Sequence, residues 1–318
     1  MRRARIGVIG TVVEDTIDRP GETTVRDMGG GYHSIIAMSV LLPTDFEAVP
    51  IVNVGEDALA RVRADLERLP RISLDGIRGV PAINNKVHLE YDGRGGRGET
   101  LTGGVPPLAW EDLEPWVGEL AAWCWNFIAG NEVDRETFER VKRAAVDPLH
   151  LDVHNLCLGP PRKGKPREPQ PLPDWEGWVE GTTWVQVNEA EAGLLWNGAP
   201  RAPSRVEEAA LADRIRSLGV EGLLITRGER GATWFPSGGT AYHAPATTGP
   251  GIDPTGCGDV FGATWLALRV AHGLGPEAAV RGAVLASGAA ATVSGTARLA
   301  DALAVAAETI LHPGATRR

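Results

Sequence analysis

Apolar runs of strand length alternate with segments of helix length along most of this chain. Continuous apolar runs are typical of parallel strands that are buried on both faces of a sheet. The alternation therefore predicts an α/β fold, with a central, mostly parallel sheet flanked by helices on both faces. At 318 residues, we expect one domain spanning 1–318. Strands are predicted at 5–9, 49–54, 125–129, 149–153, 183–187 and 222–226, and helices at 32–42, 57–69, 134–146, 204–218 and through most of the chain from Gly256 onward.

Two segments break this rhythm because polar and apolar residues alternate singly in them. They are 22–27 and 83–91, and the second is followed by a glycine-rich turn at 92–98 and a short run at 99–102. Single alternation is typical of half-exposed antiparallel strands. We predict a small β-sheet lid inserted into the main domain, with strands at about 12–28 and 81–104.

Charge and composition exclude several classes of protein. The formal net charge is −9, which argues against general nucleic-acid binding, since that depends on basic surfaces. No apolar stretch is long enough to span a bilayer, and the start MRRARIGVIG reads as a first strand and not as a secretion signal. The three cysteines (Cys124, Cys157, Cys257) form no CxxC pair. We therefore expect no membrane or nucleic-acid partner, and a reducing, cytoplasmic location.

The most informative stretch is 247–265, TTGPGIDPTGCGDVFGATW, where a glycine-rich turn leads into an apolar helix. Backbone N–H groups of Gly256, Cys257 and Gly258 would point out of the helix start, where the macrodipole is positive, and so form an anion site. Asp259 has two interpretations. It is either a base beside a bound phosphate or an ordinary acidic residue of a first helical turn.

The sequence Asp253–Asp259, DPTGCGD, resembles the DTxGAGD motif of the ribokinase-like (PfkB) sugar and nucleoside kinases. Further elements of that family occur in the same order along nearly the whole chain. They are GTVVED at 10–15, the triple glycine at 29–31, NEAE at 188–191 and TRGERG at 226–231. No GxxxxGK[ST] loop occurs, so a P-loop kinase is excluded.

The resemblance implies a phosphotransferase, an ATP-dependent kinase that uses Mg²⁺ and phosphorylates a hydroxyl of a small sugar or polyol. A nucleoside kinase and a non-catalytic sugar- or nucleotide-binding protein are the alternatives. The resemblance to the family also implies that Asp259 is the catalytic base and that the N–H groups of Gly256, Cys257 and Gly258 form an anion hole. The implied acceptor residues are Asp15, Gly29, Gly30, Gly31 and His33, and the implied nucleotide residues are Asn188, Glu191, Thr226, Gly228, Gly231 and Ser287. Glu191 would handle Mg²⁺ through water, and Asp253 would bind a monovalent cation, K⁺, or only cap its turn. A homodimer through the lid is also implied.

The chain departs from the family pattern at a few positions. Ser34 stands where sugar kinases usually carry asparagine, and Gly31 stands at the position of a lysine. Tyr32 and His33 would contact the acceptor or face the core, and a nucleoside kinase would use Tyr32, Ile35 and Ile36 as an apolar platform for the base. Cys257 replaces the usual alanine. At a helix N-terminus its thiol should have a lowered pKa, which predicts sensitivity to oxidants that bound ATP would prevent.

Two other features have a plain interpretation beside a functional one. His150, Asp152 and His154 share one face at strand spacing, as a metal site would require. Because the segment ends a buried strand, a polar edge of the site is the interpretation favoured over a metal centre. The segment 159–173 is rich in proline and basic residues. It is predicted to be a solvated surface loop, with an arm that touches an anionic ligand as the alternative.

Overall fold

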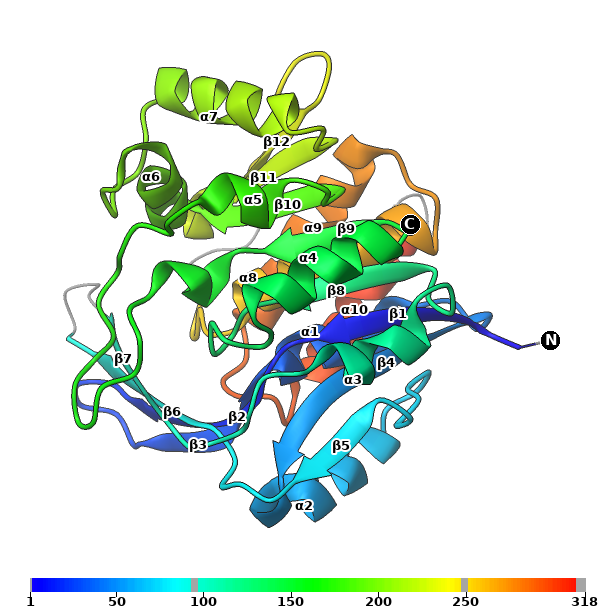
Figure 1. Ribbon diagram of the computed structural model, residues 1–318, viewed down its shortest axis with the longest axis vertical. Coiled ribbons are helices and arrows are strands. Elements are labelled where there is room, and N and C mark those ends of the chain that lie inside the picture. The colour runs from blue at the N-terminus through cyan, green and yellow to red at the C-terminus, as the bar shows by residue number, and fades with distance from the viewer. Residues whose placement is uncertain (1, 93–96, 247–250, 313–318) are drawn as a thin grey trace, which may run out of the picture.

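The computed structural model describes residues 2–92, 97–246 and 251–312. In it the predicted apolar strands form one large sheet (Figure 1). Neighbouring strands from β5 to β11 are parallel, and the last two at the other edge are antiparallel. In spatial order they are β13 (Tyr242–Ala244), β12 (Ala232–Pro236), β11 (Gly222–Thr226), β10 (Trp184–Asn188), β9 (Leu149–Asp152), β8 (Ala122–Asn126), β1 (Ala4–Ile9), β4 (Phe46–Gly55) and β5 (Ile77–Val80).

Helices cover both faces of this sheet, so the predicted fold class is confirmed. One face packs against α1 (Gly31–Leu41), α2 (Glu56–Glu67), α8 (Cys257–Val270), α9 (Pro276–Ala290) and α10 (Leu299–Leu311). The other face packs against α3 (Trp110–Leu113), α4 (Arg135–Ala144), α5 (Trp175–Val179), α6 (Glu189–Asn197) and α7 (Arg205–Ser217). Short 3₁₀ turns lie at η1 (Glu114–Trp116), η2 (His154–Cys157) and η3 (Gly228–Arg230). The sheet thus divides the core into two apolar layers, as buried parallel strands require.

A second sheet of four strands lies beside one edge of the main domain (Figure 1). It runs in the order β3 (Val25–Gly30), β2 (Val12–Asp18), β6 (Lys86–Tyr91) and β7 (Arg97–Thr102). Val87 and Leu89 are buried on its inner face while Lys86 and Glu90 are exposed, as the alternation predicts. Of the predicted turn, 93–96 lie outside the described residues.

The prediction that these strands are all antiparallel is wrong for the central pair. The β2–β3 and β6–β7 pairs are antiparallel hairpins, whereas β2 and β6 run parallel from Glu14–Lys86 to Asp18–Glu90. Each hairpin is local in sequence, but the two are joined through residues 31–85 of the main domain, which form α1, β4, α2 and β5. A connection of that length can return in either direction, so alternation alone does not fix the pairing.

The strand predicted at 125–129 begins and ends earlier than expected, at Ala122–Asn126. Its last parallel pair is Asn126 with Asp152. Phe127 is apolar because it packs into the core layer against α4 and α5. Ile128 and Ala129 are apolar because they pack under the small sheet. The apolar run therefore extends beyond the end of β8, because residues 127–129 are buried by contacts outside the sheet.

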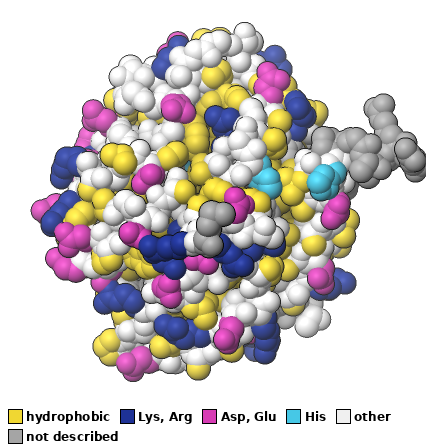
Figure 2. Space-filling model, turned by 90° about the vertical axis from the view of Figure 1, so that its right-hand side faces the viewer, with side chains coloured by type: hydrophobic (Ala, Val, Ile, Leu, Met, Phe, Trp, Pro, Cys, Tyr) yellow, Lys and Arg dark blue, Asp and Glu magenta, His cyan; other side chains and the backbone are white. Residues whose placement is uncertain are grey.

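The surface in Figure 2 carries basic and acidic side chains interspersed with scattered apolar atoms. Among the described helices, none combines the length and the apolar character needed to cross a membrane.

Candidate active site

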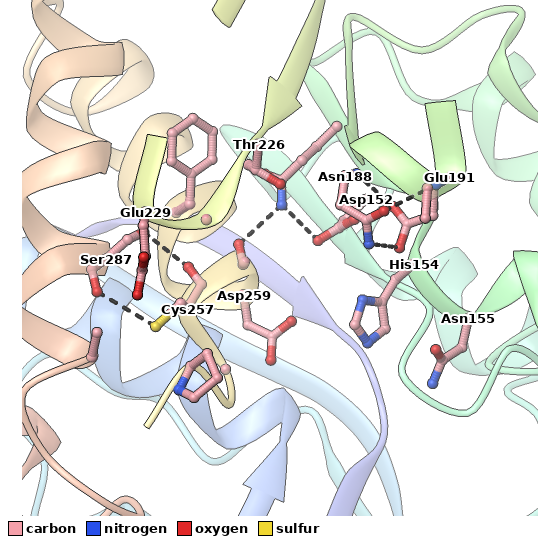
Figure 3. A pocket seen from close by; sticks show the side chains of 18 of the residues that line it. Asp152, His154, Asn155, Asn188, Glu191, Thr226, Glu229, Cys257, Asp259 and Ser287 are labelled. Carbon is pink, nitrogen blue, oxygen red and sulfur yellow. Dashed lines mark hydrogen bonds between the residues drawn. The ribbon is translucent and has the colours of Figure 1, made fainter. Parts of the chain in front are cut away.

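A cavity of about 530 Å³ opens at the carboxyl ends of the parallel strands, against the start of α8. Open α/β sheets bind ligands at this edge, because loops that follow successive strands converge there. The lining includes the last residues of β9, β10 and β11, the first turn of α8, and part of α9. Figure 3 shows Cys257 and Ser287 on one side of Asp259, with Asp152, His154, Asn188 and Glu191 on the other.

The turn into α8 depends on a glycine in a left-handed conformation. Gly256 is the N-cap of α8 with φ +75°, and a Cβ there would lie 2.1 Å from the His33 ring. Gly256, Cys257 and Gly258, the residues predicted to form an anion site, all line the cavity. The Cys257 N–H also donates to the Pro254 carbonyl at 3.3 Å. N–H groups in a first helical turn have no acceptor within the helix, so Gly258 and Asp259 extend this donor surface.

Asp259 is 5% exposed and its side chain is held by two neighbouring elements. The Asn126 side-chain amide donates to Asp259 Oδ1 at 2.8 Å, and His33 Nδ1 lies 3.7 Å from Oδ2. The Ser34 hydroxyl donates to the backbone carbonyl of Asp259 at 3.2 Å. Sequence reasoning missed Asn126. The available signal was a single polar residue that ends the apolar run AWCWN.

Three potential metal ligands converge in the cavity: Asp152, His154 and Asp259 have ligand atoms within 4.8 Å of one another. Burial and the charges of Glu191 and Asp259 hold the pKa of Asp152 well above its usual value. The Gln186 amide donates to Asp152 Oδ2 at 2.8 Å and to the Gly258 carbonyl at 3.0 Å, which joins β10 to α8. The predicted polar edge thus holds for Asp152 and His154. His150 lies buried behind it, where burial lowers its pKa to about 4.

The NxxE element forms a capping box at the start of α6. Asn188 Oδ1 accepts from the Glu191 N–H at 2.9 Å, and Glu191 Oε2 accepts from the Asn188 N–H at 2.8 Å. Each side chain therefore satisfies a backbone donor at the helix end. Both residues also line the cavity, so the element has a structural role as well as a position at the site.

The other predicted nucleotide residues also line this cavity: Thr226 and Gly228 with Gly231 from the end of β11 and η3, and Ser287 from α9. Gly231 has φ +89°, and a Cβ there would lie 2.0 Å from the Ala244 carbonyl oxygen, so the turn requires glycine. The Ser287 hydroxyl donates to the Cys257 carbonyl at 2.9 Å, which ties α9 to the start of α8.

The prediction of a lowered pKa for Cys257 is wrong. Burial and the negative charges of Asp253 and Asp259 raise the pKa of this thiol to about 12. The thiol is directed to the Ser287 carbonyl, with Sγ 3.5 Å from that oxygen. Desolvation and neighbouring carboxylates therefore outweigh the helix dipole.

The predicted acceptor residues lie where the small sheet meets α1, outside the lining of the described cavity. Of these residues, His33 lies beside the Asp259 carboxylate. Asp15 on β2 is 6% exposed and lies against Gly29, where a Cβ would overlap its carboxylate. Gly30 has φ +59° as N-cap of α1, and the Gly31 N–H donates to the Thr11 carbonyl at 2.9 Å. The His33 ring packs against Gly256, where a Cβ would lie 2.1 Å from it.

Tyr32, by contrast, faces the core. Its side chain is 3% exposed in the cluster that contains α2, and its hydroxyl lies 3.5 Å from the Val62 carbonyl. Of the two interpretations for this residue, core packing is the one that the structure supports.

The proline-rich segment 159–173 is exposed over most of its length, but Arg167 is 7% exposed and lines the cavity. Its guanidinium lies 3.3 Å from Glu99 Oε1 on β7, and its backbone N–H donates to the Glu99 carbonyl at 2.7 Å. The solvated-loop prediction is therefore wrong at Arg167, which anchors the segment to the small sheet.

A family model described as "pfkB family carbohydrate kinase" matches residues 164–303. Among curated proteins, bifunctional protein HldE of Nitrobacter winogradskyi is 43% identical over 95 residues, covering 29% of this chain and 19% of that protein. HldE of Bradyrhizobium diazoefficiens is 30% identical over 196 residues, covering 61% and 39%. The chain thus matches well under half the length of these relatives.

Solved structures match along nearly the whole chain. Arabidopsis thaliana ribokinase, complexed with ribose and ATP, has a TM-score of 0.74 at 19% identity and covers 97% of this chain and 99% of its own. A pyrophosphate-dependent kinase of the ribokinase family, with a pyrophosphate analogue and myo-inositol, gives 0.72 at 18%, covering 94% and 98%. Burkholderia thailandensis nucleoside kinase with inosine gives 0.71 at 21%, covering 96% and 97%. At these identities the likeness concerns the fold.

Proposed function

We propose that this chain, which belongs to the ribokinase-like PfkB family, transfers the γ-phosphoryl group of ATP to a hydroxyl of a small sugar or polyol. The observation that carries the proposal is the position of Asp259. Its carboxylate is buried inside the cavity, one residue after the N–H groups that open α8. A base and an anion site at one point are the parts that phosphoryl transfer needs.

In this mechanism the acceptor binds between Asp259 and the Asp15–Gly29 junction of the small sheet. Asp259 Oδ2 takes the hydroxyl proton, since Oδ1 already accepts a hydrogen bond from Asn126. The first-turn N–H groups of α8 meet the charge that develops on the transferred group, and they require no rearrangement to do so. The small sheet acts as a lid that excludes water and favours transfer over hydrolysis.

The far end of the cavity suits a nucleotide. We assign Thr226, Gly228, Gly231 and Ser287 to this part, where they line the cavity around the start of α8 and α9. Gly228 and Gly231, both at positive φ, bring backbone close to the space that a ligand would occupy.

The donor set at the centre of the cavity fits a hydrated divalent cation. Asp152, His154 and Asp259 have ligand atoms within 4.8 Å of one another, and Glu191 lines the same cavity. Asp152, His154 and Glu191 would hold Mg²⁺ there, directly or through water, because Mg²⁺ prefers carboxylate and water oxygens. When bound, Mg²⁺ offsets the negative charge of the nucleotide phosphates.

A sugar or polyol is favoured over a nucleoside because the apolar platform expected for a base is not available. Tyr32, Ile35 and Ile36 are all under 5% exposed and belong to the core around α1. A non-catalytic binding protein would have no use for a buried carboxylate beside an anion site.

The test is a screen of sugars, polyols and nucleosides for ADP release from MgATP, with a parallel arm that uses pyrophosphate as donor. We expect turnover with MgATP and at least one sugar or polyol, and ³¹P NMR should identify a phosphate monoester. No turnover across the panel, with MgATP still bound, would favour the binding protein. Turnover with pyrophosphate alone would overturn the assignment of ATP.

A further inference from the structure

The carboxylate of Asp253 opens the turn that leads into α8, and it is 2% exposed. Oδ1 accepts from the Arg19 guanidinium at 2.6 Å and from the Thr255 N–H at 2.9 Å. Oδ2 accepts from the Ser294 hydroxyl at 3.0 Å. Both oxygens therefore have donors, and among the residues that the structure describes Arg19 is the one cation that donates to this carboxylate.

Arg19 reaches this turn from another part of the molecule. It follows β2 directly, so it belongs to the small sheet, and its side chain is 12% exposed. The guanidinium stacks on Tyr91, 4.9 Å from the ring centre, at the end of β6. The Tyr91 hydroxyl lies 3.2 Å from Thr255 Oγ1. A stacked, hydrogen-bonded arginine is held in a fixed orientation.

A second contact links the same hairpin to the same region. Asp27 Oδ2 on β3 accepts from the Thr296 N–H at 2.6 Å, two residues from Ser294. The hairpin β2–β3 thus contacts both short segments that surround the Asp253 carboxylate, around 253–255 and 294–296.

These contacts disagree with the monovalent cation that family resemblance implies at Asp253. A buried carboxylate requires a compensating positive charge, because its desolvation is costly. In this chain that charge comes from the Arg19 side chain, which donates directly to Asp253 Oδ1 at 2.6 Å. We propose that Arg19 takes the place of the monovalent cation, so that this protein needs no K⁺ and the small sheet itself positions the turn before α8. The effect on turnover rests on the proposed function, whereas the replacement of the cation does not.

The experiment compares thermal unfolding of the full chain in KCl and in tetramethylammonium chloride at equal ionic strength, since tetramethylammonium is too large for such a site. The variants are Arg19→Ala, the conservative Arg19→Lys, and Arg26→Ala as matched control. Arg26 is an exposed arginine on the same hairpin.

For the wild type and Arg26→Ala we expect the same Tm in both salts, within about 1 °C. For Arg19→Ala we expect a Tm about 5 °C lower in tetramethylammonium, because breaking a buried pair leaves a carboxylate uncompensated. K⁺ should restore at least half of that loss in a saturable manner. Arg19→Lys should need no K⁺. If the Arg19–Asp253 pair contributed only packing, K⁺ would not specifically raise the Tm of Arg19→Ala.

Three results would overturn the proposal: saturable stabilisation of the wild type by K⁺, an Arg19→Ala variant as stable as Arg26→Ala, or an Arg19→Ala loss that K⁺ does not reverse. If Arg19→Ala does not fold, the wild-type comparison and Arg19→Lys still decide the question. Because Tm requires no turnover, failure of the acceptor screen leaves this result unaffected.

Discussion

The side-chain amide of Asn126 donates to Asp259 Oδ1 at 2.8 Å, and both residues are at most 5% exposed. Asn126 ends β8 and Asp259 lies in the first turn of α8, so the contact joins the main sheet to the helix that carries the anion site. It fixes the plane of the carboxylate. Oδ2 is then the oxygen left for the acceptor proton in the proposed mechanism.

Replacing Asn126 should therefore affect turnover more than binding. We expect Asn126→Ala to lower kcat about 10- to 100-fold, because small displacements of a reacting group carry costs of that size. The KM for MgATP should change by less than about threefold. Wild-type kcat in Asn126→Ala would contradict the positioning role.

Two glycines of the anion site provide a matched pair. Gly256→Ala places a Cβ 2.1 Å from the His33 ring at φ +75°, so we expect a loss of about 1–3 kcal/mol in the free energy of unfolding. Gly258→Ala meets only Gln186 Nε2 at 3.8 Å and should change it by less than about 1 kcal/mol. Urea unfolding measures both. Equal losses would show that the left-handed turn is not what requires glycine.

The thiol of Cys257 should be unreactive despite its position at a helix start. With a pKa of about 12, only roughly one molecule in 10⁴ to 10⁵ carries the thiolate near pH 7.5. We expect negligible modification by iodoacetamide within an hour, with or without ATP, and a Cys257→Ala variant with kcat within about twofold of wild type. Rapid alkylation that ATP prevents would contradict the raised pKa.

Asp152 should make stability depend on pH. Its raised pKa means that, above the ordinary aspartate pKa, the folded chain keeps a proton that the unfolded chain has lost. Stability contributed at this site therefore falls as pH rises through that window. Asp152→Asn removes the effect, so we expect it to be more stable than wild type at pH 7.5 by about 1 kcal/mol, with a smaller advantage near pH 4.5.

Tm measured across that range tests this, with Asp301→Asn, at an exposed position of α10, as control. An advantage of Asp152→Asn that is constant with pH would contradict the account, as would a loss of stability at pH 7.5.

Much of the fold could be predicted because the spacing of apolar residues along the sequence follows from which side chains are buried. The run at 222–226 is buried on both faces and coincides with β11. The motif around Asp259 was also readable, since a glycine turn before a small-residue helix has few structural solutions. Contacts between distant segments could not be predicted. Asn126, Gln186 and Arg19 meet the site only after the sheet order and the small sheet bring residues separated by up to 234 positions together.

The error at Cys257 has the same origin. Local sequence gives the helix start but not the burial, or the carboxylate of Asp253 that the fold places beside the thiol. The prediction of a solvated loop at 159–173 was wrong at Arg167 because the partner of this arginine, Glu99, lies on the small sheet, 68 positions away in the sequence.

The most direct test of the central claim is the turnover of Asp259→Asn, measured with an acceptor from the screen and compared with Asp301→Asn. Asparagine keeps the shape and can still accept the Asn126 hydrogen bond, but it cannot take a proton. We predict a kcat lower by about 10²- to 10⁴-fold, with the Kd for MgATP within a few-fold of wild type. Wild-type kcat in Asp259→Asn would contradict the assignment of Asp259 as the base.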